Sequence, residues 1–185
     1  MPLNVNVQRP EAMIFDLDGT LFQTETLLLP AYRNTFRRLR EEGLYEGETP
    51  PESRILGALG KLLPQIWLEV IPDSAEAVRN RANELLLTFQ KEGLRQGLGE
   101  LYPGVKETLE RLHAMGIRLF VASNGLEEYV KGVVMHTGIA PLFEEVYSAG
   151  EYDTASKVDL VRLLLRRHRP ASAWMGGDRT SDGEA

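Results

Sequence analysis

An apolar run over residues 12–15 ends at two aspartates, Asp16 and Asp18, and this junction limits the fold more than any other stretch. The run predicts a buried strand of a parallel sheet. Ionised carboxylates beside a core must be paired or bound to a metal ion. In open α/β sheets, ligands bind beyond the carboxyl ends of the strands. We therefore expect an α/β sheet whose chemistry lies at the end of this strand.

The composition excludes several classes of function. The chain has 185 residues, a formal net charge of −6 and no cysteine. The acidic balance argues against a general nucleic-acid binder, and the lack of cysteine excludes disulfides, thiolate zinc sites and cysteine nucleophiles. The N-terminus has no signal-peptide pattern, and no stretch approaches the ~20 apolar residues of a membrane span. We expect a soluble cytoplasmic protein without a membrane partner.

Residues 23–99 show helical periodicity and no convincing strand. Pro30 is expected to open the first helix, which ends near Gly43. Further helices are expected at residues 53–59, 62–70 and 75–89. We therefore predict a helical domain over residues 23–99, inserted into a core domain formed by residues 1–22 and 100–185.

Strand and helix patterns alternate from Tyr102 onward, as is typical of βα units with right-handed crossovers. Apolar strands are expected at residues 117–122, 146–148 and 173–175. Unusual polar residues follow these strands, and they are Ser123, Lys157, Asp178 and Asp182. Polar groups that gather at one end of a sheet are typical of an active site.

Four ordered motifs resemble those of the haloacid dehalogenase-like superfamily. They are Asp16-x-Asp18-Gly-Thr, Ser123-Asn124-Gly, an isolated Lys157 that opens a helix, and Gly-Asp178-x-x-x-Asp182. The long helical block after the first motif resembles the helical cap of the phosphoglycolate phosphatase and β-phosphoglucomutase branch. The resemblance implies a three-layer Rossmann-like sandwich with a mainly parallel sheet and a helical cap inserted after the first strand.

The resemblance also implies a role for each motif. Asp16 would be the nucleophile, and Asp18 would be the general acid and base. Ser123, Asn124 and Lys157 would bind the transferring phosphoryl group. Phosphoryl transfer suits these residue types, because a carboxylate nucleophile divides a slow hydrolysis into two easier steps.

A magnesium ion is the cofactor that the resemblance implies. Mg²⁺ prefers a few oxygen ligands and water, which fits Asp16, the Asp18 backbone carbonyl and Asp178. Asp182 would orient the water or the neighbouring ligands. In the cap loop, Arg54 and Lys61 are candidates for contact with the substrate. The expected function is Mg²⁺-dependent hydrolysis of a small phosphorylated metabolite by a monomer or weak homo-oligomer.

Three other functions stay open at this point. A phosphosugar mutase of the same family would use the same residues. A receiver-like signalling module also uses clustered aspartates, a hydroxyl and a lysine, but it has no helical insert of this size. Relatives usually continue through another strand and helix, so we expect that these are missing here and that the chain is truncated. A truncated, inactive protein that binds phosphate or Mg²⁺ is therefore the third alternative.

Overall fold

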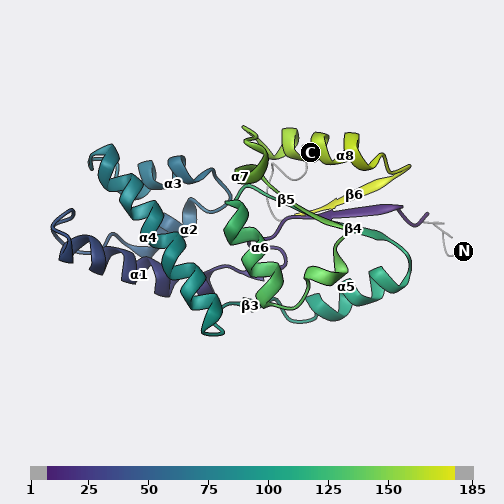
Figure 1. Ribbon diagram of the computed structural model, residues 1–185, viewed down its shortest axis with the longest axis horizontal. Helices are drawn as coiled ribbons and strands as arrows, with labels where there is room; N and C mark the ends of the chain where they lie inside the picture. Colours follow the sequence, from purple (N-terminus) through teal and green to yellow (C-terminus); the bar gives the residue numbers. More distant parts are fainter. Residues whose placement is uncertain (1–7, 178–185) are drawn as a thin grey trace, which may run out of the picture.

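Four parallel strands form the main sheet of the computed structural model, which describes residues 8–177 (Figure 1). The strands lie in the order β5-β4-β1-β6. Their bounds are β1 Ala12–Phe15, β4 Arg118–Ser123, β5 Glu145–Ser148 and β6 Ala173–Gly176. Phe15 pairs with Val121 on one side and with Gly176 on the other, so β1, β4 and β6 end at the same edge. The predicted parallel sheet is confirmed.

Helices cover both faces of this sheet (Figure 1). On one face lie α5 (Val105–Ala114), α6 (Glu127–His136) and the 3₁₀ helix η1 (Ala140–Leu142), and on the other lie α7 (Ala149–Tyr152) and α8 (Lys157–His168). Strand β4 supplies both cores, because successive side chains point to opposite faces. Leu119 and Val121 pack with the α5 and α6 side, whereas Phe120 and Ala122 pack with α8. The predicted three-layer sandwich is confirmed.

A block of four helices projects from one end of the sheet (Figure 1). We call these helices the helical insert, and their bounds are α1 Glu25–Glu41, α2 Glu52–Gly57, α3 Leu63–Val70 and α4 Glu76–Arg95. The insert has its own apolar core, in which Phe36 contacts Tyr32, Tyr45 and Trp67 through edge-on and tilted ring packing. None of the helices within residues 8–177 has the length and apolar character needed to cross a membrane.

Two short strands connect the helical insert to the rest of the chain. Strand β2 (Phe22–Gln23) pairs antiparallel with β3 (Glu100–Leu101), so the two connections lie side by side. The sequence pattern did not predict this pairing, because two residues are too few to show an alternating period. Gly99 precedes β3 with φ +95°, and an added Cβ would lie 2.7 Å from Cζ of Phe22. Glycine is therefore required where the two connections meet.

The expected start of the first helix at Pro30 is wrong. Helix α1 begins at Glu25, and Pro30 lies inside it. An interior proline costs about 3 kcal/mol, because it removes a backbone hydrogen bond and crowds the carbonyl four residues earlier. The turn before Pro30 carries Leu27 and Leu28, which are 1% and 3% exposed. Burial of two leucines stabilises the helix by about 3–6 kcal/mol, which offsets the proline.

Candidate active site

Asp16 and Lys157 form a buried ion pair at the end of β1. The Nζ atom of Lys157 lies 2.7 Å from Oδ1 of Asp16, and the two side chains are 3% and 6% exposed. The same Oδ1 accepts a hydrogen bond from the backbone N–H of Leu17, and Nζ also donates to the carbonyl of Ala122 at 3.0 Å. The structure thus brings the first and third predicted motifs together across 141 positions of sequence.

Lys157 reaches Asp16 because it is the first residue of α8. The preceding Ser156 caps this helix by accepting a hydrogen bond from the backbone N–H of Asp159. A helix N-terminus favours anions, and a buried lysine there needs an anion to offset its charge. The position of Lys157 at the start of α8 therefore brings its ammonium group to the carboxylate of Asp16 at the sheet edge.

A tight turn places Asp18 beside the end of β1. The carbonyl of Leu17 accepts hydrogen bonds from the backbone N–H groups of Thr20, Leu21 and Phe22. Gly19 has φ +77°, a conformation that glycine adopts without a steric penalty. The turn spans residues 17–22 and leaves Asp18 partly buried.

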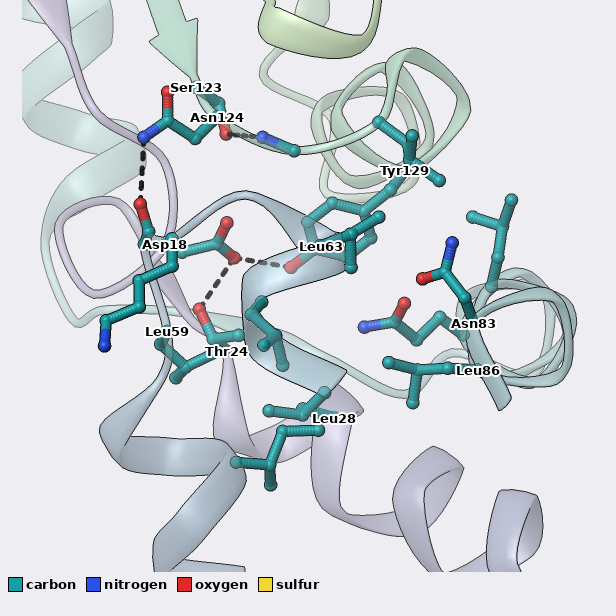
Figure 2. A pocket seen from close by; sticks show the side chains of 18 of the residues that line it. Asp18, Thr24, Leu28, Leu59, Leu63, Asn83, Leu86, Ser123, Asn124 and Tyr129 are labelled. Carbon is teal, nitrogen blue, oxygen red and sulfur yellow. Dashed lines mark hydrogen bonds between the residues drawn. The ribbon is translucent and has the colours of Figure 1, made fainter. Parts of the chain in front are cut away.

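Two hydroxyl groups hold the carboxylate of Asp18, as Figure 2 shows. Thr24 donates from Oγ1 to Oδ1 at 2.8 Å, and Tyr129 donates from its phenol oxygen to the same atom at 2.5 Å. Burial, and then the nearby carboxylate of Asp18, raises the pKa of Tyr129 well above its usual range. The phenol therefore keeps its proton and stays a donor.

Sequence reasoning missed both of these hydroxyl groups. Tyr129 lies in the first turn of α6, six residues beyond Ser123, and Thr24 is the residue before α1. A polar residue before a helix is a signal for a helix start, but the Thr24 hydroxyl donates to Asp18 and does not cap α1. For Tyr129 there is no such signal, because only the packing of α6 against the sheet brings its ring over Asp18.

The second predicted motif lies at the end of β4. Ser123 is buried, and its Oγ accepts a hydrogen bond from the backbone N–H of Gly125 at 3.2 Å. Asn124 donates from Nδ2 to the carbonyl of Gly60 in the helical insert at 2.9 Å (Figure 2). Its Oδ1 is buried and has no hydrogen-bond partner among the described residues. Asn124 therefore joins the sheet edge to the insert and presents an unused acceptor.

A cavity lies between the helical insert and the sheet edge. Its lining includes the predicted residues Asp16, Asp18, Ser123, Asn124, Lys157 and Lys61. Arg54 is not brought to this cavity, because its guanidinium donates to the carbonyl of Val70 within the insert. Asp178 and Asp182 lie outside the residues that the structure describes.

The donors at the edge of the sheet suit a hard cation. Mg²⁺ commonly binds to proteins through one or two carboxylates and completes its shell with water and substrate phosphate. The described residues contain no cluster of three His, Cys, Asp or Glu side chains. The buried carboxylate of Asp16 and the nearby backbone of Asp18 supply oxygen donors of the required kind. The residues present therefore fit Mg²⁺ better than a transition metal with nitrogen or sulfur ligands.

Comparisons with known proteins agree with this geometry. A family model of haloacid dehalogenase-like hydrolases matches residues 10–185. A phosphoglycolate phosphatase of Vibrio vulnificus (strain CMCP6) is 31% identical in an alignment of 183 positions that covers 95% of this chain and 78% of that protein. A predicted phosphatase from Clostridium acetobutylicum superposes with a TM-score of 0.76 at 20% identity, covering 95% and 79% of the two chains. CbbY from Rhodobacter sphaeroides, solved in complex with phosphate, gives a TM-score of 0.69 at 25% identity, covering 89% and 76%.

Proposed function

Because the chain belongs to the haloacid dehalogenase-like hydrolases, we propose that it is a Mg²⁺-dependent phosphatase that hydrolyses a small phosphomonoester. The buried Asp16–Lys157 pair at the polar end of the cavity carries this proposal. Desolvation of two buried ions offsets much of their attraction, so a contribution to stability alone is a weak explanation for such a pair. The similarity to a phosphoglycolate phosphatase supports the same reaction class.

In the proposed first step, a carboxylate oxygen of Asp16 attacks the phosphorus atom. The bond between phosphorus and the ester oxygen breaks, and an aspartyl phosphate forms. The leaving oxygen takes its proton from the carboxyl group of Asp18, so no free alkoxide is released. The Thr24 and Tyr129 hydroxyl groups support this role, because they fix one oxygen of Asp18 and limit the directions in which the other can point.

In the second step, water attacks the phosphorus atom of the aspartyl phosphate. The ionised Asp18 removes a proton from this water, the bond to Asp16 breaks, and inorganic phosphate leaves. Ser123, Asn124 and Lys157 hold the oxygens of the phosphoryl group through both steps. Lys157 is suited to this role, because its ammonium group is already held in place by Asp16 and the carbonyl of Ala122.

The proposed metal ligands are the carboxylate of Asp16, the backbone carbonyl of Asp18 and Asp178, with Asp182 orienting their neighbours. The last two lie outside the described residues. When bound, Mg²⁺ supplies positive charge that offsets the repulsion between the substrate dianion and the nucleophile.

We also propose that the enzyme consists of a core domain, residues 1–22 and 100–185, and a cap domain, residues 23–99. The pairing of β2 with β3 supports these boundaries, because both connections between the two parts run through it. A cap that covers the cavity would limit the access of bulk water to the phosphoryl group while the ester is bound. A small phosphorylated metabolite fits the cavity between these two parts.

Phosphate release tests the proposal. The purified chain is assayed with phosphoglycolate, hexose phosphates, nucleoside monophosphates and simple alkyl phosphates, with Mg²⁺ and again with EDTA. We expect release with Mg²⁺ only, at a rate that falls at least about 10³-fold in Asp16→Asn, because the amide cannot attack phosphorus. Asp73→Asn, at an exposed position of the helical insert, is the matched control and should keep the full rate.

Acid quenching during turnover tests the intermediate. Mass spectrometry should find one added phosphoryl group on the peptide that contains Asp16. Product analysis separates a phosphatase from a mutase, which would release little free phosphate. The proposal is wrong if no member of the panel releases phosphate with Mg²⁺, or if Asp16→Asn keeps the wild-type rate.

A further inference from the structure

The cavity has one polar end and an otherwise aliphatic wall. Asp16, Asp18 and Lys157 lie at the polar end with Ser123 and Asn124. The aliphatic wall comes mainly from the helical insert and consists of Leu28, Ile55, Leu59, Leu63, Ile66 and Leu86. Figure 2 shows Leu28, Leu59, Leu63 and Leu86 among the side chains that line this cavity. The part of a substrate beyond its phosphate would therefore meet mainly hydrocarbon.

Little charge lies along this wall to receive an anionic substrate group. Away from the polar end, Lys61 is the single charged residue among the described lining residues. Its Nζ forms an ion pair with Oε1 of Glu69, and its side chain is 46% exposed. The positive charge of Lys61 is therefore already balanced and largely solvated. A carboxylate placed in the cavity would lose its water without gaining a dedicated cation, which is strongly unfavourable.

Two neutral amides from α4 complete the lining. Asn83 accepts a hydrogen bond from Nε1 of Trp67 through its Oδ1, which leaves its N–H groups for another acceptor. Gln90 is only 8% exposed and lines the same cavity. The two amides can therefore form hydrogen bonds with a ligand that carries a neutral polar group.

We propose that the substrate is a phosphomonoester of a largely apolar, uncharged alcohol. This inference rests on the proposed phosphatase function and specifies the substrate class of the same site. The phosphate lies at Asp16 and Lys157, the hydrocarbon part contacts the leucine wall, and a neutral polar group pairs with Asn83 or Gln90. Esters whose alcohol part carries a carboxylate, such as phosphoglycolate, or several hydroxyl groups, such as hexose phosphates, are poor substrates of this cavity.

An isosteric pair of substrates tests the proposal. Isobutyl phosphate and phosphoglycolate have the same number of non-hydrogen atoms, but the first ends in two methyl groups and the second in a carboxylate. Each buried carbon contributes about fourfold to kcat/KM, so two methyl groups should give isobutyl phosphate an advantage of about fifteenfold or more. The isosteric phosphonates, isopentylphosphonate and phosphonopropionate, should show the same order in Kd, which is free of any leaving-group effect.

A charge placed in the wall should reverse this preference. Leu63→Lys puts an ammonium group among the lining residues, so kcat/KM should rise for phosphoglycolate and fall for isobutyl phosphate. Leu68→Lys is the matched control on the same helix, because Leu68 is 50% exposed and does not line the cavity. The control should keep the wild-type preference. If Leu63→Lys does not fold, the wild-type comparison of the two substrates still decides the question.

The outcomes separate this inference from the function on which it rests. Equal or faster hydrolysis of phosphoglycolate by the wild-type chain overturns the inference and leaves the phosphatase function intact. The absence of phosphate release from every ester counts against the phosphatase function itself. In that case, tighter binding of phosphonopropionate than of isopentylphosphonate would overturn the apolar cavity as well, and the opposite order would support it.

Discussion

Replacement of Lys157 by methionine should destabilise the fold, because it leaves the carboxylate of Asp16 buried without its cation. The two charged groups are 2.7 Å apart, and their side chains are 3% and 6% exposed. Removal of one partner from such a pair typically costs about 3–5 kcal/mol. Asp16→Asn should cost less than Lys157→Met, because the ammonium group keeps the carbonyl of Ala122 and asparagine keeps an oxygen acceptor.

The double variant, Asp16→Asn with Lys157→Met, removes both charges. Coulomb attraction at this distance is about 6 kcal/mol for an effective dielectric constant of 20, and part of it is offset by desolvation of the two ions. We therefore expect the double variant to lose less stability than the sum of the single variants, with a coupling energy of about 2–4 kcal/mol. This coupling does not depend on which ester the enzyme uses.

Urea unfolding followed by far-UV circular dichroism measures the four free energies of unfolding, in EDTA so that no metal contributes. The exposed pair Arg33–Glu52 is the control, since its atoms are also 2.7 Å apart but its side chains are 60% and 37% exposed. A cycle on that pair should give less than about 1 kcal/mol. If the buried pair couples no more strongly than the exposed pair, the charge of Lys157 is not held by Asp16 as described.

Three further predictions concern single residues. Tyr129→Phe should lower kcat about ten- to hundredfold with a smaller change in KM, because it removes a hydroxyl that orients the proposed acid and base, and a wild-type kcat would contradict this role. Gly99→Ala should lower the free energy of unfolding by about 1–3 kcal/mol more than Gly97→Ala. Both glycines have positive φ, but only at Gly99 would the new methyl group meet another side chain within 3 Å, so equal losses in urea unfolding would contradict the stated clash. Glu144→Gln tests a pH dependence. The hydrogen bond from Arg118 lowers the pKa of Glu144 in the folded protein below its ordinary value of 4.5. The ionised Glu144 therefore stabilises the fold above pH 4.5, and this stabilisation is lost as the pH falls through the pKa of the folded protein. The loss of stability in Glu144→Gln, less than about 1 kcal/mol in urea unfolding at neutral pH, should therefore disappear in acid, and a loss that grows in acid would contradict this sign.

The layers of the fold were predictable from the sequence because they follow from long periodic patterns. The run at residues 12–15 and the apolar strands before Ser123 and after Arg169 could be assigned without knowledge of tertiary contacts. Local patterns misled where burial decided the outcome. Pro30 looks like a helix start, but the leucines before it gain more from packing than the proline costs. The two-residue strands β2 and β3 depend on partners 77 and 79 positions away and leave no local signal.

The residues at the polar end of the site were predictable from the sequence, but most of their contacts were not. The sequence placed Asp16 and Lys157 near one edge, and the structure pairs them directly. Neither the contact of Asn124 with Gly60 nor the hydrogen bond from Arg54 to the carbonyl of Val70 could be expected from the sequence. Because of that hydrogen bond, Arg54 does not line the cavity. Contacts of this kind depend on how the insert meets the sheet edge, which no spacing within either part determines. The cytoplasmic location and the oligomeric state stay predictions.

The contacts of Asp18 connect the position of the helical insert to the proposed proton transfer. One hydroxyl on its carboxylate comes from Thr24, directly before the insert begins, and the other comes from Tyr129 in the α/β part. The hydrogen bond from Asn124 to Gly60 links the sheet edge to the loop between α2 and α3, and both residues line the same cavity. Thr24 directly follows β2, the strand through which the chain enters the insert. The orientation of the proposed acid therefore depends on where the chain enters the insert as well as on the packing of α6 against the sheet.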